Sequence, residues 1–135
     1  MPIESLTICD WANTDQRDQV IQNPSWSDVE DAIRSLDNKA RNDLYLKPQD
    51  TTQDTFLGVG GGDGKYLVHG SEGGERFPTL SGPAGTDERL VPLCVGGQLA
   101  EYPARWIVDL DRTLAAVKMF YEAGTFDCGV KWEYF

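Results

Sequence analysis

The 135-residue sequence holds few of the residues that build metal and redox sites. Its only histidine is His69, and its three cysteines stand at positions 9, 94 and 128. Because these cysteines are widely spaced and form no Cys-x-x-Cys pair, neither a zinc ribbon nor a redox motif is predicted. Their number is odd and two lie in apolar runs, so we expect reduced thiols that pack as small hydrophobic groups in a reducing compartment.

Positive charge is also scarce, with 12 lysine and arginine residues against 22 aspartate and glutamate residues and a net charge of −10. Nucleic acids are disfavoured as direct partners, since their affinity depends on basic residues that neutralise phosphates. An anionic membrane surface is disfavoured for the same reason. A basic protein would be attracted, although acidity that only keeps the chain in solution explains the composition equally well.

Long hydrophobic runs are missing as well. No apolar stretch comes near the roughly 20 residues that a membrane-spanning helix needs. The first 11 residues lack the basic start and the long apolar core of a secretory signal, so we expect a cytoplasmic protein. The length fits one domain over residues 1–135, which can bury a core without metal or disulfide support.

Hydrophobic periodicity predicts short strands and two helices. The first helix begins at Ser27, which forms a capping box with Glu30, and ends at Asp37. Strands are expected at 3–11, 43–47, 55–59, 65–69, 90–95 and 128–135, with a shorter one near 77–80. Residues 106–108 are expected to form a short strand or an extended segment. Connections are expected at 13–24, 49–54 and 71–87. The predicted fold class is α+β: a mostly antiparallel sheet of about five to six strands with two helices packed on one face.

The second helix is preceded by two acidic residues, Asp109 and Asp111, and it reaches Ala123 with Gly124 as its left-handed stop. A carboxylate at this place caps a helix N-terminus, which is the interpretation that we favour. The alternative is that the Asp-x-Asp pair holds Mg²⁺ together with a phosphate-bearing substrate. A small Mg²⁺-dependent enzyme therefore stays open as a second function.

Other motifs that carry chemistry are weak. The run Gly60–Gly64 lies between two predicted strands and so predicts a hairpin turn, whereas a phosphate-binding loop leads from a strand into a helix. His69 lies near Ser71 but outside the Gly-x-Ser-x-Gly pattern of a nucleophile elbow. We therefore expect no catalytic residue, no metal site and no cofactor. A regulatory ligand-binding domain is a third possibility, which an apolar pocket with converging polar groups would favour.

A pattern of glycines and aromatic residues in the second half of the chain points to a known family. It is carried by Val91–Ala104 (VPLCVGGQLAEYPA), by the predicted helix Leu110–Glu122 and by the terminal Val130–Glu133. The glycine-rich hairpin 57–66 and the helix 26–36 precede these segments in the expected order. From about residue 26 onward, the chain resembles the Imm1 family of bacterial immunity proteins.

The resemblance implies an immunity protein of a bacterial polymorphic toxin system. Such proteins are commonly linked to toxins with a deaminase fold, which act on nucleic-acid bases, and they bind and block the cognate toxin in the cytoplasm of the producing cell. The sequence lacks the His-x-Glu and Pro-Cys-x-x-Cys signature of zinc deaminases, so it would be the inhibitor and not the toxin. A toxin of this kind needs a basic substrate groove, towards which an acidic partner is steered.

The expected contact surface is the segment 98–102, where Gln98, Glu101 and Tyr102 follow a double glycine and are predicted to project as a loop. The hairpin tip with Gly62 and Asp63 is the second choice. The alternative interpretation is that the double glycine forms a bulge and that Glu101 and Tyr102 satisfy nearby backbone groups.

Aromatic residues are further candidates for anchors at a protein interface, although most are expected in the core. These candidates are Trp11, Trp26, Tyr45, Tyr66, Tyr102 and Trp106. Trp132 is expected to be a core residue, and Glu133 is expected to pair with Arg105 or Arg112.

Overall fold

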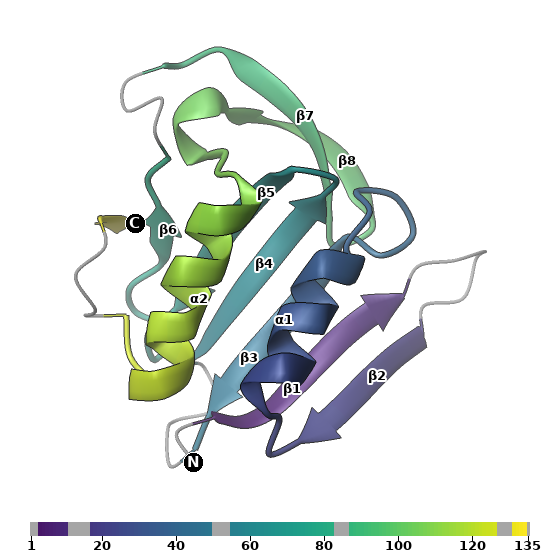
Figure 1. Ribbon diagram of the computed structural model, residues 1–135. Helices are drawn as coiled ribbons and strands as arrows, with labels where there is room; N and C mark the ends of the chain where they lie inside the picture. The colour runs from purple at the N-terminus through teal and green to yellow at the C-terminus, as the bar shows by residue number, and fades with distance from the viewer. Residues whose placement is uncertain (1–2, 11–16, 50–54, 83–86, 127–130, 135) are drawn as a thin grey trace.

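The structure is a computed structural model that describes residues 3–10, 17–49, 55–82, 87–126 and 131–134 (Figure 1). Its helices are α1 (Trp26–Ser35), α2 (Leu110–Ala123) and a short 3-10 helix (Ala104–Trp106). Its strands are β1 (Ile3–Asp10), β2 (Arg17–Gln22), β3 (Asp43–Pro48), β4 (Phe56–Gly62), β5 (Lys65–Ser71), β6 (Pro78–Leu80), β7 (Leu90–Val95), β8 (Gln98–Pro103) and β9 (Trp132–Tyr134). Within the described residues, no helix is long and apolar enough to cross a membrane.

Seven of the strands form one sheet in the order β2-β1-β3-β4-β5-β6-β9, and all neighbouring strands in it are antiparallel. Strands β7 and β8 pair only with each other and make a separate hairpin. The α+β class is confirmed, with more strands than the five to six expected. The extra strands are β2, which lies in the expected connection 13–24, and β8, which lies where a projecting loop is expected.

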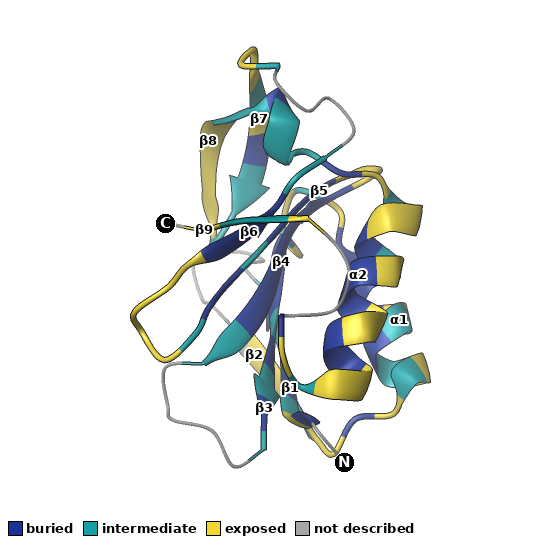
Figure 2. Cartoon of the chain, turned by 90° about the vertical axis from the view of Figure 1, so that its left-hand side faces the viewer, coloured by how far each residue is buried: buried dark blue, intermediate teal, exposed yellow. Residues whose placement is uncertain are grey.

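Both helices cover the same face of the large sheet, as predicted, and the hydrophobic core lies between these two layers (Figure 2). The ring of Trp26 at the start of α1 meets the ring of Tyr121 on α2 edge to face, with ring centroids 5.7 Å apart. The hydroxyl of Tyr121 donates a 2.7 Å hydrogen bond to the carbonyl oxygen of Pro24. Core side chains from both layers include Leu6, Ile33, Leu44, Leu57, Val68, Val117 and Phe120.

The capping box predicted at Ser27 is wrong by two residues, and α1 begins at Trp26, one residue earlier than expected. The N-cap is Ser25, whose hydroxyl accepts a 3.1 Å hydrogen bond from the Asp28 N–H, while the Asp28 carboxylate accepts one from the Ser25 N–H. Two overlapping Ser-x-x-acid patterns compete here, and the earlier one lets Trp26 pack on α2. The helix also ends earlier than expected, because Leu36 adopts an extended conformation.

The second helix matches its prediction. Asp109 is the N-cap, its carboxylate accepting a 2.8 Å hydrogen bond from the Arg112 N–H, and Gly124 ends the helix with φ of 74°. The short strand near 77–80 is also confirmed, as β6. Residues 106–108 form the extended segment and not the short strand: a 3-10 helix ends at Trp106, Ile107 is extended, and Val108 makes a bridge to Tyr66.

Some predicted features lie outside the described residues. They are Trp11, most of the connection 49–54, residues 83–86 of the long glycine-rich connection, and the first part of the terminal strand, including Cys128 and Val130. The described part of that strand is β9, in which Trp132 packs against the core as expected.

Candidate functional site

The hairpin β7–β8 contains the segment for which the sequence predicts a binding surface. The prediction of a projecting loop at 98–102 is wrong, because these residues form the strand β8. Gly96 and Gly97, with φ of 62° and 79°, make the two-residue turn of the hairpin. Positive φ at both central residues is what a type I′ turn requires, and glycine adopts it without strain. Residues of β8 show no alternating burial, which explains why periodicity missed the strand.

One side of the hairpin is fixed to the large sheet by buried packing. Leu93 is fully buried, and Val95 lies over Gly60 of β4. A Cβ atom added at Gly60 would lie 2.6 Å from Cγ1 of Val95, and one added at Gly61 would lie 2.9 Å from Cδ1 of Leu93. The glycines of β4 therefore form a hollow into which the hairpin inserts two apolar side chains.

Polar contacts fix the same end of the hairpin. The loop 36–42 between α1 and β3 supplies two asparagine side chains as acceptors. The Oδ1 atom of Asn38 accepts a 2.7 Å hydrogen bond from the Cys94 N–H, and Oδ1 of Asn42 accepts a 2.9 Å bond from the Gly97 N–H. Asn42 is fully buried, so its hydrogen bond is shielded from water. The hairpin is thus held to the large sheet and to the loop 36–42 by both packing and hydrogen bonds.

The same loop also holds the second surface suggested by the sequence. Gly62 is buried with φ of 131°, and a Cβ atom there would lie 2.4 Å from the carbonyl carbon of Leu36. Asp63 next to it is exposed, and its N–H donates a 3.4 Å hydrogen bond to the carbonyl oxygen of Leu36. Among the residues predicted on the hairpin, Gln98 and Glu101 are exposed and Tyr102 is half-buried. The two predicted surfaces therefore border one loop.

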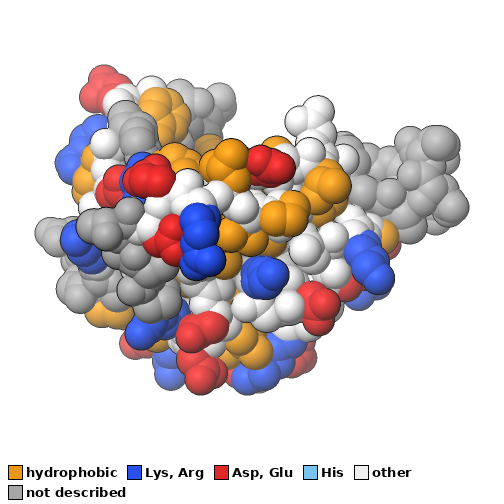
Figure 3. All heavy atoms as spheres, turned by 90° about the horizontal axis from the view of Figure 1, so that it is seen from above, with side chains coloured by type: hydrophobic (Ala, Val, Ile, Leu, Met, Phe, Trp, Pro, Cys, Tyr) orange, Lys and Arg blue, Asp and Glu red, His pale blue; other side chains and the backbone are white. Residues whose placement is uncertain are grey.

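The outer side of the hairpin carries two exposed leucines, of which Leu99 lies within the expected contact segment 98–102 and Leu90 lies outside it. Leu99 is 75 % exposed and Leu90 is 59 % exposed, the two highest values among the exposed large hydrophobic side chains of the described chain. Figure 3 looks down on this end and shows hydrophobic side chains gathered among both acidic and basic ones. Single exposed leucines are common on protein surfaces. These two stand out because both lie on the hairpin that contains the expected contact segment.

The face of the large sheet opposite the helices carries an aromatic cluster over Gly58. The rings of Tyr45, Phe56 and His69 meet edge to face, with centroids 5.7 to 6.4 Å apart. Nε2 of His69 is buried and has no hydrogen-bond partner within the described structure, and burial lowers the pKa of this imidazole. Burial and the nearby Asp43 carboxylate raise the pKa of the Cys9 thiol to about 12, so this cysteine is a poor nucleophile.

The acidic pair before α2 is accounted for by helix capping. The Asp109 carboxylate accepts a hydrogen bond from the Arg112 N–H in the first turn of α2. Asp111 is exposed in the same turn, where the helix dipole favours negative charge. In the part of the chain that the structure describes, no group of three or more His, Cys, Asp or Glu side chains could hold a metal ion.

Glu133 also has a structural role. As predicted, Glu133 pairs with Arg105, at 3.3 Å between Oε1 and NH1. It also accepts a 2.9 Å hydrogen bond from the indole N–H of Trp106. These contacts tie β9 to the segment that follows β8.

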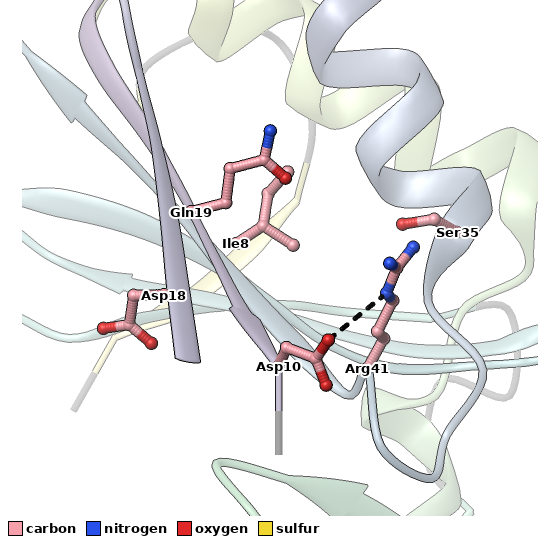
Figure 4. Close-up of a pocket in the computed structure, with 6 residues that line it drawn as sticks. All are labelled: Ile8, Asp10, Asp18, Gln19, Ser35 and Arg41. Carbon is pink, nitrogen blue, oxygen red and sulfur yellow. Dashed lines mark ion pairs between the residues drawn. The ribbon is translucent and has the colours of Figure 1, made fainter. Parts of the chain in front are cut away.

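A small polar pocket of about 140 Å³ lies between the β1–β2 edge of the sheet and α1 (Figure 4). Arg41 and Asp10 face each other across it with 4.0 Å between Nε and Oδ2, whereas Asp18 points away from the other side chains. The hydroxyl of Ser35 donates to the carbonyl oxygen of Ala32. The lining is Ile8, Asp10, Asp18, Gln19, Ser35 and Arg41, which lacks the mostly apolar wall of a typical small-molecule site.

The whole arrangement from β2 to β9 falls within one recognised family. The family model for Immunity protein Imm1 matches residues 17–134, which include the hairpin, the loop 36–42 and both helices. No curated protein and no solved structure matches the chain significantly. Because the family match spans most of the sequence, the chain belongs to the Imm1 family of immunity proteins.

Proposed function

We propose that this chain neutralises a cognate bacterial toxin by binding to it and carries out no reaction of its own. Membership of an immunity protein family supports a toxin as the partner. The observation that carries the proposal is the β7–β8 hairpin, a projecting arm fixed by buried packing and by two asparagine side chains. A rigid arm binds with little loss of conformational entropy, which favours tight association.

The partner that fits best is a nucleic-acid-targeting toxin domain with a deaminase fold, inhibited in the cytoplasm of the producing cell. A protein that handles DNA or RNA needs a basic groove for the phosphates. The net charge of −10 would speed the encounter with such a groove, and the hairpin would then occlude the groove or the active site. Steering of this kind acts mainly on the association rate.

Within the proposed interface, Gln98, Glu101 and Asp63 are the exposed polar residues that contact the toxin. Tyr102 and Gly62 act from beneath the surface, Tyr102 as a half-buried support of β8 and Gly62 by holding the β4–β5 turn against the loop 36–42. The exposed leucines of the hairpin would supply the apolar centre that tight interfaces need.

The test is a titration of the purified chain with the toxin domain encoded by the neighbouring gene. We expect a Kd in the nanomolar range or below, an association rate that falls as salt rises, and loss of the toxin's deaminase activity at one equivalent. Glu101→Lys should weaken binding by about tenfold or more, because it reverses a charge at the interface.

The matched control is Glu122→Lys, which makes the same change of charge at an exposed position on α2. It should lower the association rate slightly and leave the dissociation rate unchanged. Absence of binding at low salt would refute the proposed function. Equal losses for both variants would refute the hairpin as the contact surface.

A further inference from the structure

The two outer edges of the β7–β8 hairpin differ in the hydrogen bonds that their backbone N–H and C=O groups make. In a hairpin with a two-residue turn, the residues that flank the turn exchange both backbone hydrogen bonds, and bonded pairs then alternate with non-bonded ones. The register places Val95 opposite Gln98, so Leu93–Ala100 and Val91–Tyr102 are the further bonded pairs. The residues between them direct their N–H and C=O groups away from the hairpin.

Three observations support this assignment. Cys94 falls at an outward position, and its N–H donates to Oδ1 of Asn38 outside the hairpin. Pro92 also falls at an outward position, where the absence of an N–H costs no hairpin hydrogen bond. The N–H of Ala104 donates to the carbonyl oxygen of Arg89, as expected for the next bonded pair.

On β8, the outward positions are Leu99 and Glu101. Within the described residues, no hydrogen bond engages their outward N–H or C=O groups, and four of the six β8 residues are exposed. Figure 2 shows β8 as an outer strand that is exposed along most of its length. This edge therefore presents two free donors and two free acceptors in an extended conformation.

Natural edge strands are usually protected against pairing by lysine, proline or a bulge. The outer edge of β8 has no lysine or arginine and no bulge before Pro103, which closes it at its end. Its two outward residues are a leucine that is 75 % exposed and one glutamate. Between the turn and Pro103, the edge carries one charged residue and an exposed leucine, which leaves a stretch across Leu99 and Glu101 open to a partner strand.

We infer that the cognate toxin binds by adding an extended segment to the free edge of β8, so that its backbone pairs with Leu99 and Glu101. This inference rests on the proposed function, because it names how the toxin is recognised. Cross-strand neighbours on one face of a sheet interact directly. The incoming segment should therefore carry an apolar residue beside Leu99 and, two residues away, a lysine or arginine beside Glu101.

The test separates the backbone from the side chain at position 99. Leu99→Ala removes most of the side chain and keeps the N–H, whereas Leu99→Pro removes the outward N–H as well. Pro92 demonstrates that this hairpin accepts proline at an outward position. Strand addition predicts that Leu99→Pro binds the neighbouring-gene toxin domain at least about tenfold more weakly than Leu99→Ala, because a partner carbonyl loses its donor.

Amide hydrogen exchange of the wild-type chain provides a second measurement that needs no variant. In the free protein, the Leu99 and Glu101 amides should exchange quickly and the Ala100 amide slowly. In the complex all three should exchange slowly, while the amides of β2 keep their rates. Slow exchange at 99 and 101 together with the difference between the two variants would support the inference.

The outcomes separate the two proposals. If the toxin binds tightly but Leu99→Pro binds as well as Leu99→Ala, or the Leu99 and Glu101 amides still exchange quickly in the complex, strand addition is overturned and the immunity function stands. If the wild-type chain does not bind the toxin at all, the immunity function falls and the inference falls with it.

Discussion

Replacing Leu93 by alanine tests whether the hairpin is anchored as the structure indicates. The side chain is fully buried, and the wall opposite it is the backbone of Gly61, which has no side chain that could fill the space left behind. Truncation of a buried leucine to alanine costs about 3–5 kcal/mol of stability where the surroundings cannot close the cavity that is left. Since whole domains are stable by only about 5–15 kcal/mol, this loss should be large. We expect the melting temperature to fall by about 10 °C or more.

The matched control is Leu99→Ala, the same substitution on the paired strand at a position that is 75 % exposed. It should change the free energy of unfolding by no more than about 0.5 kcal/mol. Both variants can be compared with the wild type by urea denaturation followed by tryptophan fluorescence, with the slope m checked for constancy. The reasoning fails if Leu93→Ala costs less than about 1 kcal/mol, or if Leu99→Ala costs as much as Leu93→Ala.

Three further predictions concern single contacts. Asn42→Ala should lower the free energy of unfolding by about 1–3 kcal/mol and speed amide exchange in the hairpin, because the N–H of Gly97 loses its buried acceptor. Asp109→Ala should cost about 1 kcal/mol in urea denaturation through loss of the helix cap, whereas Asp111→Ala should cost less than half of that. Burial lowers the pKa of His69, so the folded protein resists protonation of this imidazole more than the unfolded chain does. The free energy of unfolding is therefore unaffected by this group above pH 6.5 and decreases as pH falls below that value. Between about pH 7.5 and 5.5 the wild type should therefore lose up to about 1.4 kcal/mol more than His69→Gln, and equal losses would contradict a buried neutral imidazole.

Elements with strong local signals could be read from the sequence. Helix α2 has a capping aspartate, an apolar stripe and a terminal glycine. Each of these signals lies in the sequence of the helix and its two caps, so it can be recognised without knowledge of distant contacts. The start of α1 was decided by packing, since Ser25 and Ser27 each begin a plausible cap and the contact of Trp26 with α2 selects the earlier one. Local patterns contain no information about that distant contact.

The strands β2 and β8 were missed for a different reason. Each is largely exposed, so neither shows the alternation of polar and apolar residues that marks a half-buried strand. For the same reason the site was found only in part. Leu99 belongs to the expected segment 98–102, but its high exposure becomes evident only once its strand is seen to lie outside the large sheet. The supporting role of Asn42 depends on a contact across 55 residues.

The alternation along β7–β8 separates residues that hold the hairpin to the large sheet from neighbouring residues that are exposed. Leu93 and Val95 face the glycines of β4 and are tied to the rest of the molecule, while Leu99 and Glu101 touch little of it. Substitutions at these outer positions can therefore accumulate at small cost to stability. Under the proposed function, the contact surface can change by a few side chains while the packing of Leu93 and Val95 on the glycines of β4 stays the same.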